Sequence, residues 1–272
     1  MTTRSSSPHP HLRVDVDDAD SAVLTLTLTN PARRNAQTPS LWEALESVAM
    51  GLDPSVRVVV IKGEGPAFSA GLDRRMLAPT PVEGEPNLLA VAQDSPVALD
   101  DLIAGFQRGF TAWAAVPAIV VAAVQGAAVG AGFQLALAAD LRVVADDVQF
   151  AMRETSLGMV PDLGGLGPLV ACVGLSRALE MCATGRAVGA AEAVGTGLAN
   201  VAVPLDQLDA TVADLVAALL ATPEAALREL KPLVRSAAVE DQDTQTGLER
   251  AAQARLLRAL ASSLAAGPST DA

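Results

Sequence analysis

Histidine and cysteine are both scarce in this chain, which has two of each among its 272 residues. His9 and His11 lie in a polar opening segment, and neither Cys172 nor Cys182 has a histidine near it in the sequence. The sequence therefore argues against a disulfide framework, a zinc site and catalysis by histidine. We expect reduced, buried thiols in a cytoplasmic protein, and acid–base chemistry carried by carboxylates whose pKa is tuned by burial.

Basic residues are also in deficit, since the formal net charge is −12 and the isoelectric point is near 4.5. Nucleic-acid binding needs a concentrated basic face, so the composition excludes a nucleic-acid partner. An anionic ligand would need a local basic group instead. The pairs Arg33-Arg34 and Arg74-Arg75 are the two candidates, although paired arginines are also common as solvated surface charge.

Charged residues are missing altogether between Gly109 and Ala139, a run long enough to cross a membrane. Pro117 and several glycines interrupt this run, and its β-branched part, Ile119-Val120-Val121, is typical of a buried strand. No cluster of Lys or Arg flanks it. We therefore expect a buried strand, a turn and a buried helix with no membrane association. The opening segment also lacks the apolar core of a signal peptide.

Strand and helix signals alternate along the chain, which predicts an α/β protein. We expect a disordered tail over residues 1–11 and a mobile, proline-containing surface loop over residues 78–96. Helical periodicity dominates from residue 205 onward, so residues 205–272 are expected to be a helical region for packing or oligomerisation. The expected strands cover residues 23–29, 57–61, 119–124, 141–144 and 149–152, and the expected helices cover residues 40–50 and 132–139.

Two glycine-containing loops, residues 62–73 and Gly130-Ala131-Gly132, can present backbone N–H groups to a ligand. The second precedes a helix, whose free N–H groups and dipole would face the same place. Such donors stabilise an oxyanion such as an enolate, and the loss of one costs about 3–4 kcal/mol of transition-state stabilisation. The alternative is a glycine turn that only serves packing.

Two carboxylates, Glu154 and Asp162, follow in a segment otherwise short of charge. Eight extended residues would span roughly 26 Å, but Gly158 and Pro161 favour a turn that brings both carboxylates to one ligand. The alternative interpretation of Glu154 is a surface glutamate paired with Arg153. The alternative interpretation of Asp162 is the N-terminal cap of a helix that starts nearby, since aspartate is favoured at that position.

Three local motifs resemble the crotonase superfamily, the enoyl-CoA hydratases and isomerases, and the likeness extends from about Val14 to Ala265. They are Arg33-Arg34-Asn35-Ala36, Phe68-Ser69-Ala70-Gly71-Leu72-Asp73, and Gln125-Gly126 through Gly130-Ala131-Gly132. The resemblance implies a spiral of ββα units over residues 12–204, a helical C-terminal region, and homotrimers or homohexamers. It also implies an acyl-CoA substrate and no metal or redox cofactor.

The resemblance further implies roles for single residues. The backbone N–H groups of Leu72 and Ala131 would hold the thioester carbonyl, and Glu154 would exchange the proton at the carbon beside it. Gln134 stands where hydratases carry their first glutamate, and the position of Asp162 resembles that in dienoyl-CoA isomerases. Residues expected to contact coenzyme A or line its pocket are Arg33, Arg34, Ala36, Ala70, Gly71, Asp73 and Gln134.

Three hypotheses follow from this pattern. The first is an isomerase in which Glu154 and Asp162 move protons at two carbons of an enoyl- or dienoyl-CoA. The second is an enoyl-CoA hydratase in which Glu154 acts with a water held by Gln134 or Asp162. The third is an acyl-CoA-binding protein without catalysis. A serine hydrolase built on Ser69 is disfavoured because the chain offers no histidine base.

Overall fold

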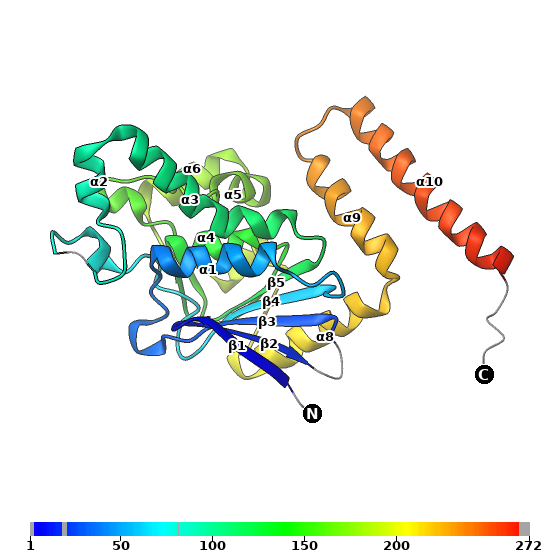
Figure 1. Ribbon diagram of the computed structural model, residues 1–272, viewed down its shortest axis with the longest axis horizontal. Helices are drawn as coiled ribbons and strands as arrows, with labels where there is room; N and C mark the ends of the chain where they lie inside the picture. Colours follow the sequence, from blue (N-terminus) through cyan, green and yellow to red (C-terminus); the bar gives the residue numbers. More distant parts are fainter. Residues whose placement is uncertain (1–2, 18–20, 81, 267–272) are drawn as a thin grey trace. The chain divides into compact units, whose positions relative to one another are not determined.

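The computed structural model describes residues 3–17, 21–80 and 82–266, and the chain divides into two compact units, residues 1–217 and 218–272. The division therefore falls inside a helix and not at residue 205. The first unit holds both sheets and all of the predicted site residues. It is built of strands and helices in alternation, which confirms the α/β class (Figure 1).

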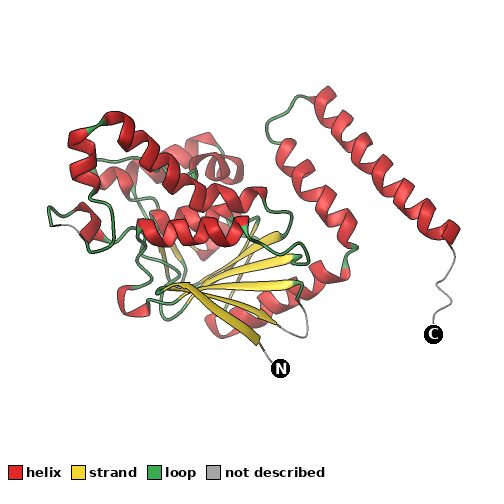
Figure 2. Cartoon of the chain, viewed as in Figure 1, coloured by secondary structure: helices red, strands yellow, loops and turns green. Residues whose placement is uncertain are grey.

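The larger sheet has seven strands in the order β1-β2-β3-β4-β5-β7-β10. Strands are drawn in yellow and helices in red in Figure 2. The first three strands of the sheet are antiparallel, and the rest run parallel. The central strands are apolar on both faces because helices cover them, as expected of parallel strands. The bounds are β1 Thr3–His9, β2 Leu12–Asp17, β3 Val23–Leu28, β4 Val58–Gly63, β5 Ile119–Val124, β7 Leu141–Ala145 and β10 Val201–Val203.

The expectation of a disordered tail over residues 1–11 is wrong for residues 3–9. These residues form β1, which pairs with β2 from Thr3 opposite Asp17 to His9 opposite Leu12. The serine-rich sequence of β1 offers little side-chain packing, but its backbone satisfies the outer edge of β2, which would otherwise be unpaired. Residues 1 and 2 lie outside the described residues.

A second sheet of three short strands, β6 Ala127–Val129, β8 Gln149–Ala151 and β9 Val188–Gly189, has the order β6-β8-β9. It carries the segment around the second glycine turn. Four 3-10 helices also occur, η1 Pro31–Arg33, η2 Arg74–Leu77, η3 Glu154–Leu157 and η4 Leu205–Gln207. The α-helices of this unit are α1 Pro39–Met50, α2 Leu88–Asp94, α3 Pro96–Ala115, α4 Ala131–Ala138, α5 Leu166–Val173, α6 Leu175–Thr184 and α7 Ala190–Gly195, and α8 Leu208–Ala221 crosses the division.

The expected mobile loop over residues 78–96 is wrong in its second half, which forms α2 and the start of α3. The side chains of Asn87 and Ser95 accept hydrogen bonds from Ala90 N and Ala98 N and so cap the two helices. These caps lie within a proline-rich stretch, and its prolines favoured the prediction of a loop. Helix α1 starts at Pro39, one residue before the predicted start, and Thr38 precedes it as the cap residue.

The long helix α3 was not predicted, and it packs on α1 over one side of the sheet (Figure 1). The ring of Trp42 in α1 lies 5.0 Å from that of Phe106 and 5.7 Å from that of Phe110, measured between ring centroids. Gly109 allows this approach, because a Cβ there would lie 2.6 Å from the carbonyl oxygen of Trp42. The aromatic pairs add to the apolar area that this contact buries.

The uncharged run from Gly109 to Ala139 contains the end of α3, then β5, β6 and α4. The prediction of a buried strand, a turn and a buried helix is therefore confirmed. In the part of the chain that the structure describes, no single helix is long and apolar enough to cross a membrane. The segments 205–221 and 224–236 pass that test by length and composition only when taken as a pair.

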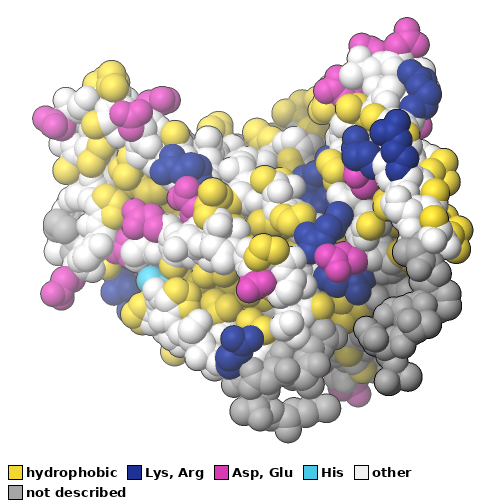
Figure 3. Space-filling model, turned by 45° about the vertical axis from the view of Figure 1, so that its right-hand side comes forward, with side chains coloured by type: hydrophobic (Ala, Val, Ile, Leu, Met, Phe, Trp, Pro, Cys, Tyr) yellow, Lys and Arg dark blue, Asp and Glu magenta, His cyan; other side chains and the backbone are white. Residues whose placement is uncertain are grey.

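The second unit holds the end of α8 and two further helices, α9 Glu224–Ser236 and α10 Gln242–Ala266. Gln245 ties them together: its side chain accepts from Ser236 Oγ at 2.7 Å and donates to Leu233 O at 3.1 Å. An ion pair at 2.7 Å joins Arg255 to Glu229. Basic and acidic side chains are interspersed on the face drawn in Figure 3. The oligomerisation role of this region stays a prediction.

Candidate active site

The two glycine loops lie directly against each other. Phe68 N donates to Gln125 O at 2.8 Å, Ser69 N donates to Ala127 O at 3.0 Å, and Val129 N donates to Ser69 O at 3.0 Å. Gly71 has a φ of +82°, and a Cβ there would collide with the carbonyl oxygen of Val129. Both the left-handed backbone and the close approach therefore require glycine at position 71.

The backbone N–H groups of Leu72 and Ala131, which lie at this junction, have no hydrogen-bond partner among the described residues. Three neighbouring N–H groups are engaged: Gly71 N donates to Ser69 Oγ, Asp73 N to Gln37 O, and Gly130 N to Ala151 O. Ala131 is the first residue of α4, where helix N–H groups are free and the dipole favours negative charge. A Cβ on Gly71 would lie 3.2 Å from Ala131 N, so the loops converge on this point.

Asn35 supports the first of these loops; it belongs to the first of the three motifs, but no role was predicted for it. It has a φ of +53° and is 1% exposed. Its Nδ2 donates to Ala67 O at 2.8 Å and to Phe68 O at 3.1 Å, and its Oδ1 accepts from Asn30 N. The available signal was the residue type, because asparagine tolerates the left-handed region better than most residues.

The residues expected to meet coenzyme A lie along this supported loop. Ala70 N donates to Arg34 O at 2.8 Å, so the segments around Arg34 and Ala70 are adjacent. Arg33 and Arg34 are exposed, while Ala36 and Ala70 are half-buried. The two arginines therefore offer positive charge at the edge of a chain that is acidic overall.

Asp73 was expected to contact coenzyme A, and its carboxylate is engaged within the protein. It lies 2.8 Å from Arg75 Nη2 and 3.5 Å from Arg33 Nη1, and it caps η2 by accepting from Arg75 N. The hydrogen bonds from the Arg75 side chain hold the pKa of Asp73 below its usual range despite burial. Asp73 therefore fixes the loop after Leu72 and orients Arg33.

Glu154 begins η3, and its carboxylate lies beside the second glycine turn. A Cβ on Gly130 would lie 3.4 Å from Glu154 Oε1. Oε1 accepts from Gln134 Nε2 at 2.8 Å, whereas Oε2 is buried and has no hydrogen-bond partner among the described residues. The structure thus contradicts the alternative of an exposed glutamate paired with Arg153. A buried carboxylate oxygen without a partner is unusual and marks a candidate catalytic group.

Asp162 is half-buried in the turn that leads to α5. Its backbone oxygen accepts from Gln107 Nε2 at 2.7 Å, which holds the turn against α3. The alternative that Asp162 caps a helix starting near Leu163 is wrong, because α5 begins at Leu166 and Gly165 is its cap residue. The side chain of Asp162 therefore has no capping role.

Both carboxylates have a raised pKa. Burial is the main cause for each, and the negative charge of Asp162 adds to the rise in the pKa of Glu154. The turn after Gly158 therefore brings the two groups close enough to interact electrostatically. Cys182 lies in the same surroundings, where burial and then the charge of Glu154 raise the pKa of its thiol. Raised carboxylate pKa values suit proton exchange near neutral pH.

Gln134 is committed to contacts within the protein. It is 1% exposed, its Nε2 donates to Glu154, and its Oε1 accepts from Leu163 N at 2.9 Å and Gly165 N at 3.3 Å. This arrangement speaks against Gln134 as the holder of a reacting water. Both cysteines are free, and no group of three or more His, Cys, Asp or Glu side chains in the described residues is arranged for a metal ion.

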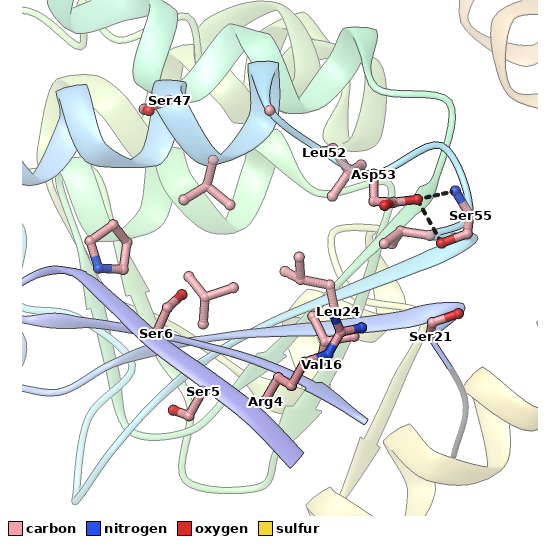
Figure 4. Close-up of a pocket in the computed structure, with 15 residues that line it drawn as sticks. Arg4, Ser5, Ser6, Val16, Ser21, Leu24, Ser47, Leu52, Asp53 and Ser55 are labelled. Carbon is pink, nitrogen blue, oxygen red and sulfur yellow. Dashed lines mark hydrogen bonds between the residues drawn. The ribbon is translucent and has the colours of Figure 1, made fainter. Parts of the chain in front are cut away.

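A cavity of about 390 Å³ lies elsewhere, between the sheet face of β1–β3 and α1 (Figure 4). Arg4, several serines and Asp53 form its polar lining, and Asp53 accepts from Ser55 N and Ser55 Oγ. Its lining, taken from the described part of the chain, includes none of the predicted site residues. The cavity and the carboxylate pair are therefore separate features.

Comparison with known proteins gives a consistent set of likenesses. Residues 18–265 match the sequence model of the enoyl-CoA hydratase/isomerase family. A probable enoyl-CoA hydratase of Mycobacterium tuberculosis is 33% identical over 183 residues, which are 66% of this chain and 65% of the relative. The carnitinyl-CoA dehydratase of Escherichia coli K12 is 38% identical over 185 residues, which are 68% of this chain and 65% of the relative. The chain thus spans slightly less than two thirds of these curated relatives.

Solved structures resemble the chain over most of its length. A putative enoyl-CoA hydratase from Thermobifida fusca in complex with acetoacetyl-CoA is 44% identical, with a TM-score of 0.86, and the match covers 91% of this chain and 95% of the other. An enoyl-CoA hydratase from Mycobacterium smegmatis is 31% identical, with a TM-score of 0.80 and coverage of 92% and 91%.

Proposed function

Because the chain belongs to the enoyl-CoA hydratase/isomerase family, we propose that it moves protons on an acyl-CoA through a thioester enolate. The observation that carries this proposal is the pair of unpartnered N–H groups of Leu72 and Ala131 beside the buried, unpartnered Oε2 of Glu154. The two N–H groups fit an oxyanion, and the carboxylate oxygen fits the base that creates this oxyanion. The acetoacetyl-CoA bound to the Thermobifida fusca protein supports a CoA thioester as the ligand.

In the proposed reaction, the thioester oxygen accepts hydrogen bonds from Leu72 N and Ala131 N. Glu154 Oε2 takes the proton from the α-carbon, and the electron pair of the broken C–H bond passes into the enolate. The negative charge then rests on the thioester oxygen, where fixed backbone donors stabilise it without reorganisation. The raised pKa of Glu154 brings its basicity closer to that needed at neutral pH.

Double-bond isomerisation is the proposed outcome. The proton taken by Glu154 leaves an enolate conjugated with the chain, and Asp162 exchanges a proton at a carbon farther from the thioester. Proton exchange at that distant carbon needs a second acid–base group. Asp162 suits this role because it is half-buried and its pKa is raised. Gln134 does not supply that group, because an amide has no useful basicity.

Hydration of a 2-trans-enoyl-CoA is the second candidate, and the names of the relatives favour it, since they are hydratases and a dehydratase. In that reaction Asp162 would hold the water and Glu154 would protonate the α-carbon. A third candidate, binding of acyl-CoA without catalysis, would leave the donors and the carboxylate without a chemical role.

Coenzyme A is proposed as the carrier of the substrate, without a metal or redox cofactor. Arg33 and Arg34 would meet its phosphates, and the backbone near Ala36, Ala70 and Gly71 would meet the adenine. Asp73 would act through Arg33, which it contacts. We further propose a cytoplasmic protein that forms homotrimers or homohexamers.

The test is to incubate the protein in parallel with a 2-trans-enoyl-CoA and a 3,5-dienoyl-CoA in water enriched in ¹⁸O. Migration of the dienoyl double bonds without ¹⁸O in the product supports the isomerase. Fast formation of an ¹⁸O-labelled 3-hydroxyacyl-CoA without migration would establish the hydratase instead.

The variant Glu154→Gln should lose either activity, and Glu43→Gln, which changes an exposed glutamate on α1, is its matched control. Full activity of Glu154→Gln would overturn both reactions. Binding of acyl-CoA with neither product would favour the non-catalytic alternative.

A further inference from the structure

Helix α4 carries two groups of the site on one face. Ala131, its first residue, offers an unpartnered N–H, and Gln134 follows three residues later, which places the two on the same side of the helix. All residues from Ala131 to Leu137 in this helix are buried. The Gln134 side chain is therefore set by the same rigid element that sets the N–H donor.

The amide of Gln134 joins two different kinds of group. Glu154 Oε1 can only accept, and the N–H groups of Leu163 and Gly165 can only donate, so the partners fix which end of the amide faces which way. A glutamate here has no donor for Glu154 and adds a second negative charge. An apolar residue leaves a carboxylate oxygen and two N–H groups without their partner, which is costly in a buried place.

Gly165 leaves room for the side chain of Gln134. A Cβ on Gly165 would lie 2.8 Å from Gln134 Cγ and 3.1 Å from Gln134 Oε1. The φ of Gly165 is −77°, which any residue can adopt, so crowding against Gln134 and not backbone conformation favours glycine here. From the other side, Gln107 holds the same turn through Asp162 O.

We propose that Gln134 is a positioning residue that ties Glu154 and the turn bearing Asp162 into one hydrogen-bonded unit. It engages Glu154 Oε1 and so leaves Oε2 as the oxygen that exchanges the proton. It also sets the separation of the two carboxylates by bonding to the backbone directly after Asp162. This inference rests on the proposed function and adds to it the residue that aligns the base.

The titratable groups around Glu154 define what a pH profile will report. Asp162 faces it from the turn, and the thiol of Cys182 faces it from α6, while Arg153 precedes it in the chain and is exposed. The hydrogen bond from Gln134 favours the ionised carboxylate and so lowers its pKa against the effect of burial. Loss of that bond should raise the pH at which the base becomes active.

The experiment measures deuterium incorporation at the α-carbon of 3-butenoyl-CoA in deuterated water as a function of pH. For Gln134→Glu and Gln134→Met, the midpoint of the acid limb should move upward by about one pH unit, with a rate near neutral pH at least about tenfold lower. Gly165→Ala keeps the amide but displaces it, and should shift the midpoint in the same direction. It provides the test if the Gln134 variants do not fold.

Gln107→Met is the matched control, because it removes the other bond to the turn without touching Glu154. It should lower the rate and leave the midpoint in place. An unchanged midpoint in every folded variant of Gln134 and in Gly165→Ala, with an active wild type, would overturn the positioning role alone. Absence of exchange by the wild-type protein would overturn the proposed function and this inference together.

Discussion

At the scale of single residues, Glu154 combines a buried carboxylate with one engaged and one unpartnered oxygen. Burial raises its pKa, so the folded state holds a proton on Glu154 more tightly than the unfolded chain does. Native stability from this group is therefore gained as the pH falls through the raised pKa and is reduced above it. Burial of Glu154 therefore lowers the stability of the fold at neutral pH and makes the carboxylate a stronger base.

Replacing Glu154 by Gln should raise the melting temperature at pH 7–8 by about 2–4 °C, because the buried charge is removed while the group that accepts from Gln134 is kept. The difference should shrink as the pH falls toward the ordinary pKa of a glutamate, about 4.3. Thermal unfolding of both proteins from pH 4 to 8 measures this. A variant less stable than the wild type at pH 8 contradicts the account.

A substitution of Asp162 should affect the two proton transfers differently. Replacement by Asn removes the second acid–base group but leaves Glu154 and both N–H donors, so migration of a dienoyl double bond should fall by about 10²–10⁴-fold. Deuterium exchange at the α-carbon should persist within about tenfold of the wild-type rate. Equal losses in both assays would show that Asp162 has no separate role.

Single residues also show the limit of sequence reasoning. The motif Gly130-Ala131-Gly132 pointed to the N–H donors, and the family resemblance pointed to Glu154, whose carboxylate the structure places beside that turn. The contacts of Asp73 and Gln134 were not foreseeable, because each depends on partners far away in the sequence, or on the rotamer chosen in a packed site. The helix-cap alternative for Asp162 failed because the helix starts three residues later than expected.

At the scale of elements, the site depends on two glycine loops that approach more closely than any side chain permits. Gly71→Ala should reduce both stability and activity, since it adds a methyl group against Val129 O at a φ of +82°. Backbone strain of this kind costs about 1–3 kcal/mol, and the collision adds to it. Gly84→Ala is the matched control, because Gly84 has a φ of +79° but nothing within 4 Å of its Cβ position.

Denaturant unfolding and α-proton exchange of the two variants measure this difference. Gly84→Ala should lose stability only by the strain and keep its exchange rate. Gly71→Ala should lose more stability and at least about tenfold in rate, because the N–H of Leu72 moves with the loop. Equal behaviour of the two variants contradicts the close approach of the loops.

Elements also divide into those that the sequence predicted and those that it did not. Strands β3, β4, β5 and β7 have strong apolar or alternating patterns, and their predicted positions agree with the structure within a few residues. Helices α2 and α3 were missed. Pro86 lies just before the cap residue of α2, Asn87, and Pro96 is the first residue of α3 after the cap Ser95, and both prolines look like loop signals when the caps are not recognised. Strand β1 was missed because its pairing, not its own composition, creates it.

At the scale of the whole molecule, the crotonase-like fold expected from three short motifs is confirmed by the family match and by solved structures. The helices α9 and α10 expose several large apolar side chains, Leu230, Val234, Leu257 and Leu260, and exposed apolar side chains favour association where they lie together. We predict a trimer or a hexamer. Light scattering coupled to size-exclusion chromatography should give a mass three or six times 27.7 kDa. A monomer at micromolar concentration contradicts this prediction.

The central claim is that Leu72 N, Ala131 N and Glu154 Oε2 together create and hold a thioester enolate. A crystal structure with a bound, slowly reacting acyl-CoA tests it most directly. The account predicts the thioester oxygen at about 2.7–3.1 Å from both nitrogens, the α-carbon beside Glu154 Oε2, and Asp162 facing a carbon farther along the chain. A thioester oxygen bonded to neither N–H, or an α-carbon on the side away from Glu154, would contradict it.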